Sequence, residues 1–217
     1  MKKKMLITGG HGDIAHCLAD VFGEEFDVYA PGRDVLDVTD SLNVKLYIEK
    51  LKPDVVINCA GYINPGSVKD CGVNGWVSEV EVNLLGCFYV SHYALKQGCS
   101  CIINIGSSAG TKGKAGWSGY CASKRGVVSL TESLCNEGVC CFCVSPGRTQ
   151  TKMRSMLFPE EDTSTLLPPS IFANVVFILY QNRGSICGCD VVVKQKPDGG
   201  VGLYRSRIVL EELKDDL

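Results

Sequence analysis

The sequence predicts an α/β fold in which helices cover both faces of a doubly wound parallel sheet. Short apolar runs of strand character alternate along the chain with longer stretches of helical periodicity. Glycines, polar residues or small residues follow several of the apolar runs directly, namely Gly9, Asp37, Ala60, Ser107 and Pro146. Since parallel strands end at a common edge of the sheet, we expect these residues to form one site there.

The strands are expected where apolar residues cluster between turn signals. Met5-Leu6-Ile7-Thr8 defines the first strand, and Val55-Val56-Ile57 lies within the third. The expected strands cover residues 4–8, 26–30, 54–58, 100–105, 139–144 and 190–194.

The helices are expected between these strands. In the first helix, Leu18, Val21 and Phe22 recur with helical spacing. The expected helices cover residues 13–22, 41–51, 74–97, 118–136 and 168–182. This alternation favours a parallel sheet, because parallel neighbours need a crossover connection that is usually a helix.

The size and composition of the chain agree with one domain. At 217 residues, 45% hydrophobic and 21% charged, the chain can bury a substantial core, which we assign to residues 1–198, followed by a charged tail at 199–217. No apolar stretch approaches the roughly 20 residues that span a bilayer, and the strand after Lys2 to Lys4 is too short for a signal peptide. We therefore expect a cytoplasmic protein with no membrane partner. The net charge of -2 gives no reason to expect nucleic acid.

Thirteen cysteines raise the alternatives of a metal site and of disulfides. Cys140 and Cys143 have C-x-x-C spacing, but an extended strand would direct them to opposite faces and no second ligand pair follows. Most of the others lie in apolar stretches, and Cys187 and Cys189 are interpreted in the same way. We expect small, reduced, mostly buried side chains, with no metal and no disulfide.

The turn after the first strand has the composition of a dinucleotide-binding turn. It reads Thr8-Gly9-Gly10-His11-Gly12-Asp13-Ile14 and leads into the first helix. Glycines allow a tight turn and a close approach of the backbone to a pyrophosphate, whose charge is met by N–H groups at the helix start. The alternative is a glycine-rich turn that binds no cofactor, but the position directly after an apolar strand favours the cofactor.

Tyr120 and Lys124 lie four residues apart in the expected helix 118–136, so a phenol and an ammonium share one face. A free tyrosine has a pKa of about 10 and is a poor acid-base catalyst at neutral pH. A neighbouring cation favours the phenolate and moves the pKa toward a useful range. An ordinary amphipathic helix with a polar edge is the alternative, because this spacing occurs often by chance.

Four further segments accompany these motifs. They are Asn58-Cys59-Ala60-Gly61, Val82-Asn83-Leu84-Leu85-Gly86, Asn104-Ile105-Gly106-Ser107 and Pro146-Gly147-Arg148-Thr149-Gln150-Thr151. In this order and spacing the motifs resemble those of the short-chain dehydrogenase/reductase family, from the first strand to Val193. The resemblance implies a single-domain Rossmann fold.

The resemblance also implies hydride transfer between NADP(H) and a carbonyl or alcohol. Tyr120 would give its proton to the carbonyl oxygen, and Ser107 would hydrogen-bond that oxygen as charge develops. Lys124 would lower the pKa of Tyr120 and bind the nicotinamide ribose, and Asn83 would hold a water that returns the proton. Ser108 is an alternative serine, but the spacing to Tyr120 favours Ser107.

The cofactor contacts implied by the resemblance come from the segments that follow the strands. They are Thr8, Gly9, Gly10, His11, Gly12, Asp13, Ile14, Arg33, Asp37, Val38, Asn58, Cys59, Ala60, Gly61, Tyr120, Lys124, Pro146, Gly147, Arg148, Thr149 and Thr151. An acidic residue at the end of the second strand would favour NAD, but Arg33 offers a planar donor fork suited to a 2′-phosphate. We therefore expect NADP, with NAD and a merely solvated Arg33 as the alternatives.

Two departures from the family pattern bear on the substrate. The opening reads Gly9-x-x-Gly12-x-x-Ala15, with Asp13 where many members have glycine. This spacing is similar to that of sugar-nucleotide reductases of the dTDP-4-dehydrorhamnose reductase type. Those enzymes have a longer C-terminal substrate domain, whereas here residues 151–170 are the expected substrate segment.

We predict an NADP(H)-dependent oxidoreductase acting on a small carbonyl or alcohol. A non-catalytic dinucleotide sensor or scaffold is the alternative, but a sensor needs no proton donor such as Tyr120. In the family, helices equivalent to residues 74–97 and 118–136 pack across a two-fold axis. Both are apolar on more than one stripe here, which predicts a homodimer or homotetramer.

Overall fold

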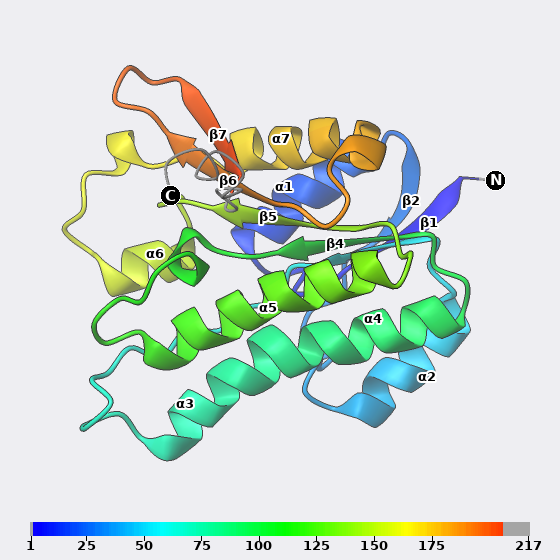
Figure 1. Ribbon diagram of the computed structural model, residues 1–217, viewed down its shortest axis with the longest axis horizontal. Helices are drawn as coiled ribbons and strands as arrows, with labels where there is room; N and C mark the ends of the chain where they lie inside the picture. Colours follow the sequence, from blue (N-terminus) through cyan, green and yellow to red (C-terminus); the bar gives the residue numbers. More distant parts are fainter. Residues whose placement is uncertain (1, 206–217) are drawn as a thin grey trace, which may run out of the picture.

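A seven-stranded sheet lies at the centre of the computed structural model, which describes residues 2–205 (Figure 1). The strands are β1 (Lys3–Ile7), β2 (Phe26–Tyr29), β3 (Val55–Asn58), β4 (Cys101–Ile105), β5 (Cys141–Pro146), β6 (Asp190–Gln195) and β7 (Val201–Arg205). They lie in the order β2-β1-β3-β4-β5-β6-β7, and all neighbours are parallel except the antiparallel pair of β6 and β7. The predicted doubly wound α/β fold is confirmed.

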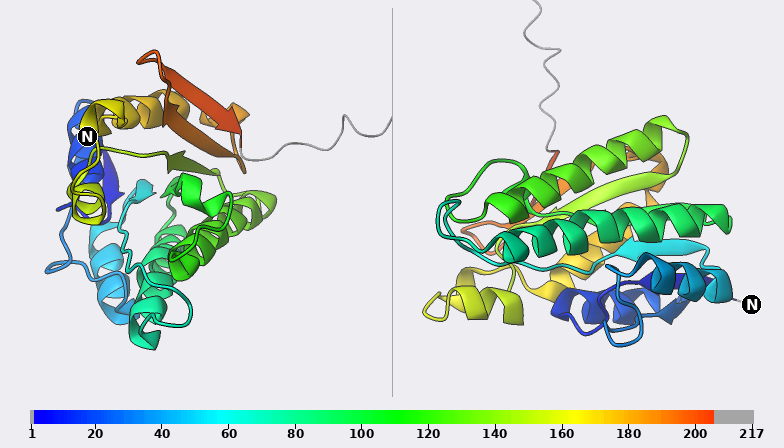
Figure 2. Two further views of the ribbon diagram at one scale, coloured as in Figure 1. Left: turned by 90° about the vertical axis from the view of Figure 1, so that its left-hand side faces the viewer. Right: turned by 90° about the horizontal axis from the view of Figure 1, so that it is seen from below.

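Helices cover both faces of this sheet. They are α1 (Asp13–Phe22), α2 (Ser41–Leu51), α3 (Val73–Val80), α4 (Gly86–Lys96), α5 (Ser118–Asn136), α6 (Lys152–Leu157) and α7 (Pro169–Gln181). Figure 2 shows α1 and α7 on one side, and α2, α4 and α5 on the other. None of the helices within residues 2–205 is long and apolar enough to cross a membrane.

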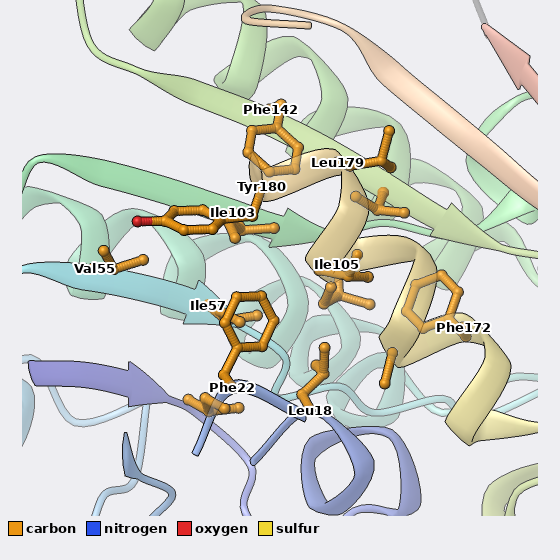
Figure 3. Close-up of a cluster of buried hydrophobic side chains, with 14 of the residues drawn as sticks. Leu18, Phe22, Val55, Ile57, Ile103, Ile105, Phe142, Phe172, Leu179 and Tyr180 are labelled. Atoms are coloured by element: carbon orange, nitrogen blue, oxygen red, sulfur yellow. The ribbon is translucent and has the colours of Figure 1, made fainter. Parts of the chain in front are cut away.

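The central strands are apolar at nearly every position because both of their faces are covered. Alternate residues of β3, β4 and β5 enter two different clusters. Ile57, Ile103 and Phe142 meet α1 and α7, where Phe22 and Phe172 pack against them (Figure 3). Each such fully buried side chain contributes roughly 1.5–3 kcal/mol to folding.

The predicted helix 74–97 is wrong as a single α-helix. A π-helical turn, Glu81–Leu85, separates α3 from α4. Asn83 lies in this turn and is fully buried, and its side chain hydrogen-bonds to the Tyr62 backbone and to Ser123. Such turns insert a residue into a helix and are frequent at functional sites. The Asn83 side chain contacts other segments at this interruption of the helix, and the periodicity of the sequence carries no information about such contacts.

The predicted tail also begins too early. Val201–Arg205 forms β7, which pairs with β6 in the register Val193 to Leu203. Asp198 and Gly199 form the turn between the two strands, where the Gly200 N–H donates to the Asp198 side chain at 2.9 Å. The domain therefore extends at least to Arg205, and the rest of the predicted tail, 206–217, lies outside the described residues.

Candidate active site

A cleft of about 620 Å³ lies where the carboxyl ends of the parallel strands meet. The predicted site residues that line it are Gly9, His11, Gly12, Asp13, Ile14, Arg33, Asp37, Val38, Cys59, Ala60, Gly61, Tyr120, Lys124, Pro146 and Thr151. The others lie beside the cleft or deeper in the protein: Thr8, Gly10, Asn58, Asn83, Ser107, Gly147, Arg148 and Thr149.

The glycine turn forms one wall of the cleft and depends on two glycines. Gly9 has a φ of +72°, and a Cβ there would lie 2.8 Å from the Ala60 Cα. A Cβ on Gly10 would collide with the Ala30 carbonyl oxygen. The turn thus presses against the segments that follow β2 and β3. It presents the first N–H groups of α1, which have no acceptor within the helix, and such groups bind anions.

Thr8 and Asn58 support the cleft from inside. The Thr8 hydroxyl accepts hydrogen bonds from the N–H groups of Cys59 and Ala60, each at 3.0 Å. The Asn58 amide donates to Ser91 and Asn104. Both residues are almost fully buried, so their side chains do not reach the cleft. A cofactor contact from either residue would involve the backbone and stays a prediction.

Tyr120 and Lys124 both face the cleft from the first turns of α5. The Lys124 Nζ lies 5.9 Å from the centre of the Tyr120 ring, and it donates to the Ile105 carbonyl at 2.8 Å. The ammonium has three N–H donors, and this carbonyl fixes one of them at the end of β4. Lys124 is only 4% exposed, so its position is set by the protein. A cation is therefore held beside the phenol, and the predicted catalytic role of the pair stays a prediction.

Asn83 fastens the loop after β3 to α5. Its Oδ1 accepts from the Tyr62 N–H at 2.8 Å, and its Nδ2 donates to the Tyr62 carbonyl at 2.8 Å and to the Ser123 hydroxyl at 3.1 Å. The Ser123 hydroxyl in turn donates to the Tyr120 carbonyl at 2.9 Å. The Asn83 side chain therefore positions neighbouring segments, and its predicted role in holding a water stays a prediction.

Ser107 lies directly after Gly106, which lines the cleft. Its Oγ accepts from the Ala109 N–H at 3.1 Å and caps a short 3-10 helix, Ser108–Gly110. This bond leaves the hydroxyl proton available to another acceptor. The arrangement fits a donor to a substrate oxygen, and the choice of Ser107 over Ser108 stays a prediction.

Sequence reasoning missed Glu79, which lies in the last turn of α3. Its carboxylate accepts from the Asn64 N–H at 2.8 Å and from the backbone N–H of Tyr120. Burial raises the pKa of Glu79, and these two hydrogen bonds partly oppose that rise. The α5 N-terminus has no cap from its own preceding side chain, so Glu79 supplies the negative charge that favours a helix start. No sequence pattern signalled this contact, because the partners of Glu79 belong to other segments.

Segment 151–170, which was expected to meet the substrate, packs close to Tyr120. The ring of Trp117 lies 5.7 Å from that of Tyr120 and 6.1 Å from that of Phe158, between centroids. Arg154 stacks on Phe158 and binds Glu161 with two hydrogen bonds of 2.6 and 2.7 Å. A cation and aromatic rings therefore hold α6 against the segment that precedes α5.

Asp13, the departure in the glycine turn, has a structural role. Its carboxylate accepts from the Lys152 N–H at 2.7 Å, at the start of α6. Thr151 caps the same helix through the Arg154 N–H. The contact joins the turn to the segment after β5 across the cleft. Of the other predicted contacts there, Gly147 donates to the Val193 carbonyl, while Arg148 pairs with Glu161 and Thr149 is buried.

The far end of the cleft is polar. The Arg33 Nε donates to the Asp37 carboxylate at 3.0 Å, and both residues line the cleft. Burial alone would raise the pKa of Asp37, but hydrogen bonds from Thr39 and Arg33 outweigh it and lower that pKa. The His11 ring fills the space next to Gly32, where a Cβ would collide with it. Arg33 and His11 thus flank one end of the cleft.

The cysteines occupy the places that strand alternation predicts. Cys140 lies near Cys101, with the sulfurs 3.6 Å apart, while Cys143 lies near Ser145 on the other face. Burial raises the pKa of Cys87 and Cys99 to about 11, so these thiols stay protonated at neutral pH. Among residues 2–205, no group of three or more His, Cys, Asp or Glu is arranged to hold a metal ion.

Comparisons with known proteins identify the family of the chain. A family model for short chain dehydrogenases matches residues 33–162. The 3-oxoacyl-[acyl-carrier-protein] reductase of Thermotoga maritima is 32% identical over 173 residues, which are 70% of each chain. Its counterpart from Haemophilus influenzae is 31% identical over 145 residues, which are 61% of this chain and 60% of that protein.

A solved structure has the same fold. It is a mutant actinorhodin polyketide ketoreductase with NADPH, which superimposes with a TM-score of 0.81 at 22% identity over 88% of this chain and 95% of that chain. At 22% identity, the likeness to this structure shows the fold alone. The family match and the relatives confirm the resemblance stated from the sequence motifs. The chain belongs to the short-chain dehydrogenase family.

Proposed function

We propose that the protein is an NADP(H)-dependent oxidoreductase that interconverts a carbonyl and an alcohol by hydride transfer. The observation that carries this proposal is the convergence of Tyr120 and Lys124 with the glycine turn in one cleft. The names of the relatives support it, since they are reductases of 3-oxoacyl groups and a ketoreductase with NADPH. The substrate is a small carbonyl or alcohol compound.

The residues present fit a dinucleotide. Gly9 and Gly10 leave room only for backbone, so the turn can approach a pyrophosphate closely. When bound, the nicotinamide supplies the hydride. Tyr120 gives its proton to the carbonyl oxygen, and Ser107 donates a hydrogen bond to the same oxygen as negative charge develops. Lys124 stabilises the resulting phenolate and holds the ribose.

A substrate panel tests the proposal. The protein is mixed with NADPH and with ketones, aldehydes, 3-oxoacyl thioesters and nucleotide-linked keto sugars, and the absorbance of the reduced cofactor is followed. We expect loss of absorbance with at least one class. Binding of NADPH without loss in any class would favour the sensor or scaffold alternative.

Cofactor preference depends on Arg33. We expect NADPH to bind more tightly than NADH. Arg33→Ala should reduce this difference in affinity by about ten- to a hundredfold, because a charge-assisted hydrogen bond to a 2′-phosphate is worth roughly 1.5–3 kcal/mol. Titration of both cofactors measures this difference. Lys50→Ala, which removes a cation from the exposed surface of α2, serves as the control. Equal affinities in the unchanged protein would mean that Arg33 does not select the cofactor.

We also propose a homo-oligomer, a dimer or a tetramer, that buries part of α4 and the end of the π-helical turn before it. Several residues expected at the interface are covered within the chain instead, namely Val90, Val127, Val128 and Leu134. Leu85 and Phe88 remain 38% and 44% exposed. Such apolar side chains on an outer helix face suit a two-fold contact.

Light scattering at micromolar concentration tests this assembly. We expect a mass at least twice the 23.4 kDa of one chain, and a fall toward one chain when Leu85 and Phe88 are both replaced by Ser. Replacing the exposed Leu42 and Leu46 of α2 by Ser is the matched control. A mass of one chain for the unchanged protein would reject the oligomer.

A cytoplasmic location is part of the same proposal. It is supported by the many cysteines, which suit a reducing compartment. The net charge of -2 offers no attraction for nucleic acid, and we propose no membrane partner.

A further inference from the structure

Two cysteines meet at the edge of the sheet opposite the cleft. Cys135 lies in the last turn of α5, and Cys187 lies in the loop that precedes β6. Their sulfur atoms are 2.9 Å apart, and both residues are partly exposed. Figure 1 shows that α5 runs from the cleft end of the sheet to the opposite end, so this pair is remote from Tyr120.

The surrounding backbone holds the two sulfurs together. Gly188 has a φ of +74°, and a Cβ there would lie only 3.1 Å from the Cys135 sulfur, so glycine allows the loop to approach α5. The Cys187 sulfur accepts from the Cys141 N–H at 3.4 Å and donates to the Val139 carbonyl at 3.3 Å. The loop that carries Cys187 is therefore fixed against α5 by several contacts.

We propose that Cys135 and Cys187 form a dithiol site that a hydroperoxide oxidises to an intramolecular disulfide. The Cys187 thiolate attacks one peroxide oxygen, the O–O bond breaks, and the leaving oxygen takes up a proton and departs as water or an alcohol. The Cys135 sulfur then attacks the resulting sulfenic acid, the S–O bond breaks and water leaves. Two thiols are oxidised to one disulfide while the hydroperoxide is reduced.

The order of the two sulfurs follows from their hydrogen bonds. Cys187 accepts from the Cys141 N–H and from the Cys135 thiol, so two donors face it, while its own proton is directed to the Val139 carbonyl. The hydrogen bond with Cys187 is the largest cause that raises the pKa of Cys135 to about 11, with burial second. Cys135 therefore keeps its proton until the second step. The competing pair, Cys140 and Cys101, is farther apart at 3.6 Å, and Cys101 is 1% exposed.

The disulfide would tie the end of α5 to the start of β6. It closes a long loop of chain, and such a link stabilises mainly by restricting the unfolded state. The expected rise in Tm is on the order of 5–10 °C. Because the link is remote from the cleft, cofactor affinity should stay unchanged. The sequence-based expectation of reduced cysteines holds for this pair only under reducing conditions.

Mass spectrometry of the full chain after hydrogen peroxide treatment tests the proposal. We expect the loss of two hydrogens, a fall from thirteen to eleven titratable thiols in denaturant, and a peptide that joins Cys135 to Cys187. A thiol reductant should reverse all three changes. Cys135→Ser and Cys187→Ser should each prevent the link, while Cys71→Ser, a partly exposed cysteine on another loop, should not.

An unchanged mass, a link between other cysteines, or a sulfinic acid at Cys187 without a link would overturn the proposal. Peptide mapping of the unmutated chain decides the matter even if a serine variant fails to fold. None of these readouts requires the enzyme's substrate, so the proposal and the proposed function stand or fall separately.

Discussion

Tyr120→Phe is expected to lower the rate of hydride transfer by about a hundredfold or more while the cofactor still binds. The change removes only the hydroxyl that would protonate the carbonyl oxygen, and a positioned acid-base group contributes roughly 10²–10⁴-fold. The ring keeps its place because it packs edge-on against Trp117. The loss should therefore appear in kcat, with little change in NADPH affinity.

Single-turnover rates and cofactor titration on the same preparation measure the two quantities separately. Tyr47→Phe is the matched control, since it removes the same hydroxyl from a half-buried tyrosine in α2. Turnover that persists unchanged in Tyr120→Phe would remove this residue from the chemistry.

Lys124→Met is expected to damage both turnover and cofactor binding. The ammonium is held at 2.8 Å from the Ile105 carbonyl and faces the cleft, so its other N–H groups are available to a ribose. Loss of charge-assisted hydrogen bonds worth roughly 1.5–3 kcal/mol weakens cofactor binding about ten- to a hundredfold. The phenolate that forms when Tyr120 gives up its proton also loses the cation held beside it, so the rate falls further.

The thermal unfolding of Lys124→Met must also be measured, because Met leaves the Ile105 carbonyl without its hydrogen-bond donor. Lys96→Met, in the exposed last turn of α4, controls for the loss of a lysine. If the folded Lys124→Met protein binds NADPH and turns over normally, the lysine has no part in the site.

Local patterns predicted the elements whose boundaries are set locally. Helices 13–22, 41–51 and 118–136 agree with α1, α2 and α5. The π-turn at Asn83 escaped prediction because its hydrogen bonds go to Tyr62 and Ser123, which are remote in the sequence. The strand β7 is short, lies at the edge and follows two glycines, so its composition indicated a tail.

In the candidate site, too, some features follow from local sequence spacing and others depend on contacts between distant segments. The glycine turn and the Tyr120 and Lys124 pair could be read from spacing, because neighbours along one turn or one helix face fix their geometry. The inward side chains of Thr8 and Asn58 and the contact of Glu79 with α5 depend on partners from other elements. Cys135 and Cys187 meet only because the end of α5 lies beside the loop before β6.

The transfer of deuterium from the cofactor to the substrate is the direct test of hydride transfer in this cleft. NADPH labelled at the transferable C4 position is incubated with the protein and the carbonyl compound that reacts in the substrate panel, and the alcohol product is analysed by mass spectrometry. We expect one deuterium on the former carbonyl carbon, and an initial rate of formation of the labelled alcohol that falls about a hundredfold or more in Tyr120→Phe. An alcohol product without deuterium, or labelled NADPH that binds and is returned unchanged with every carbonyl tested, would contradict it.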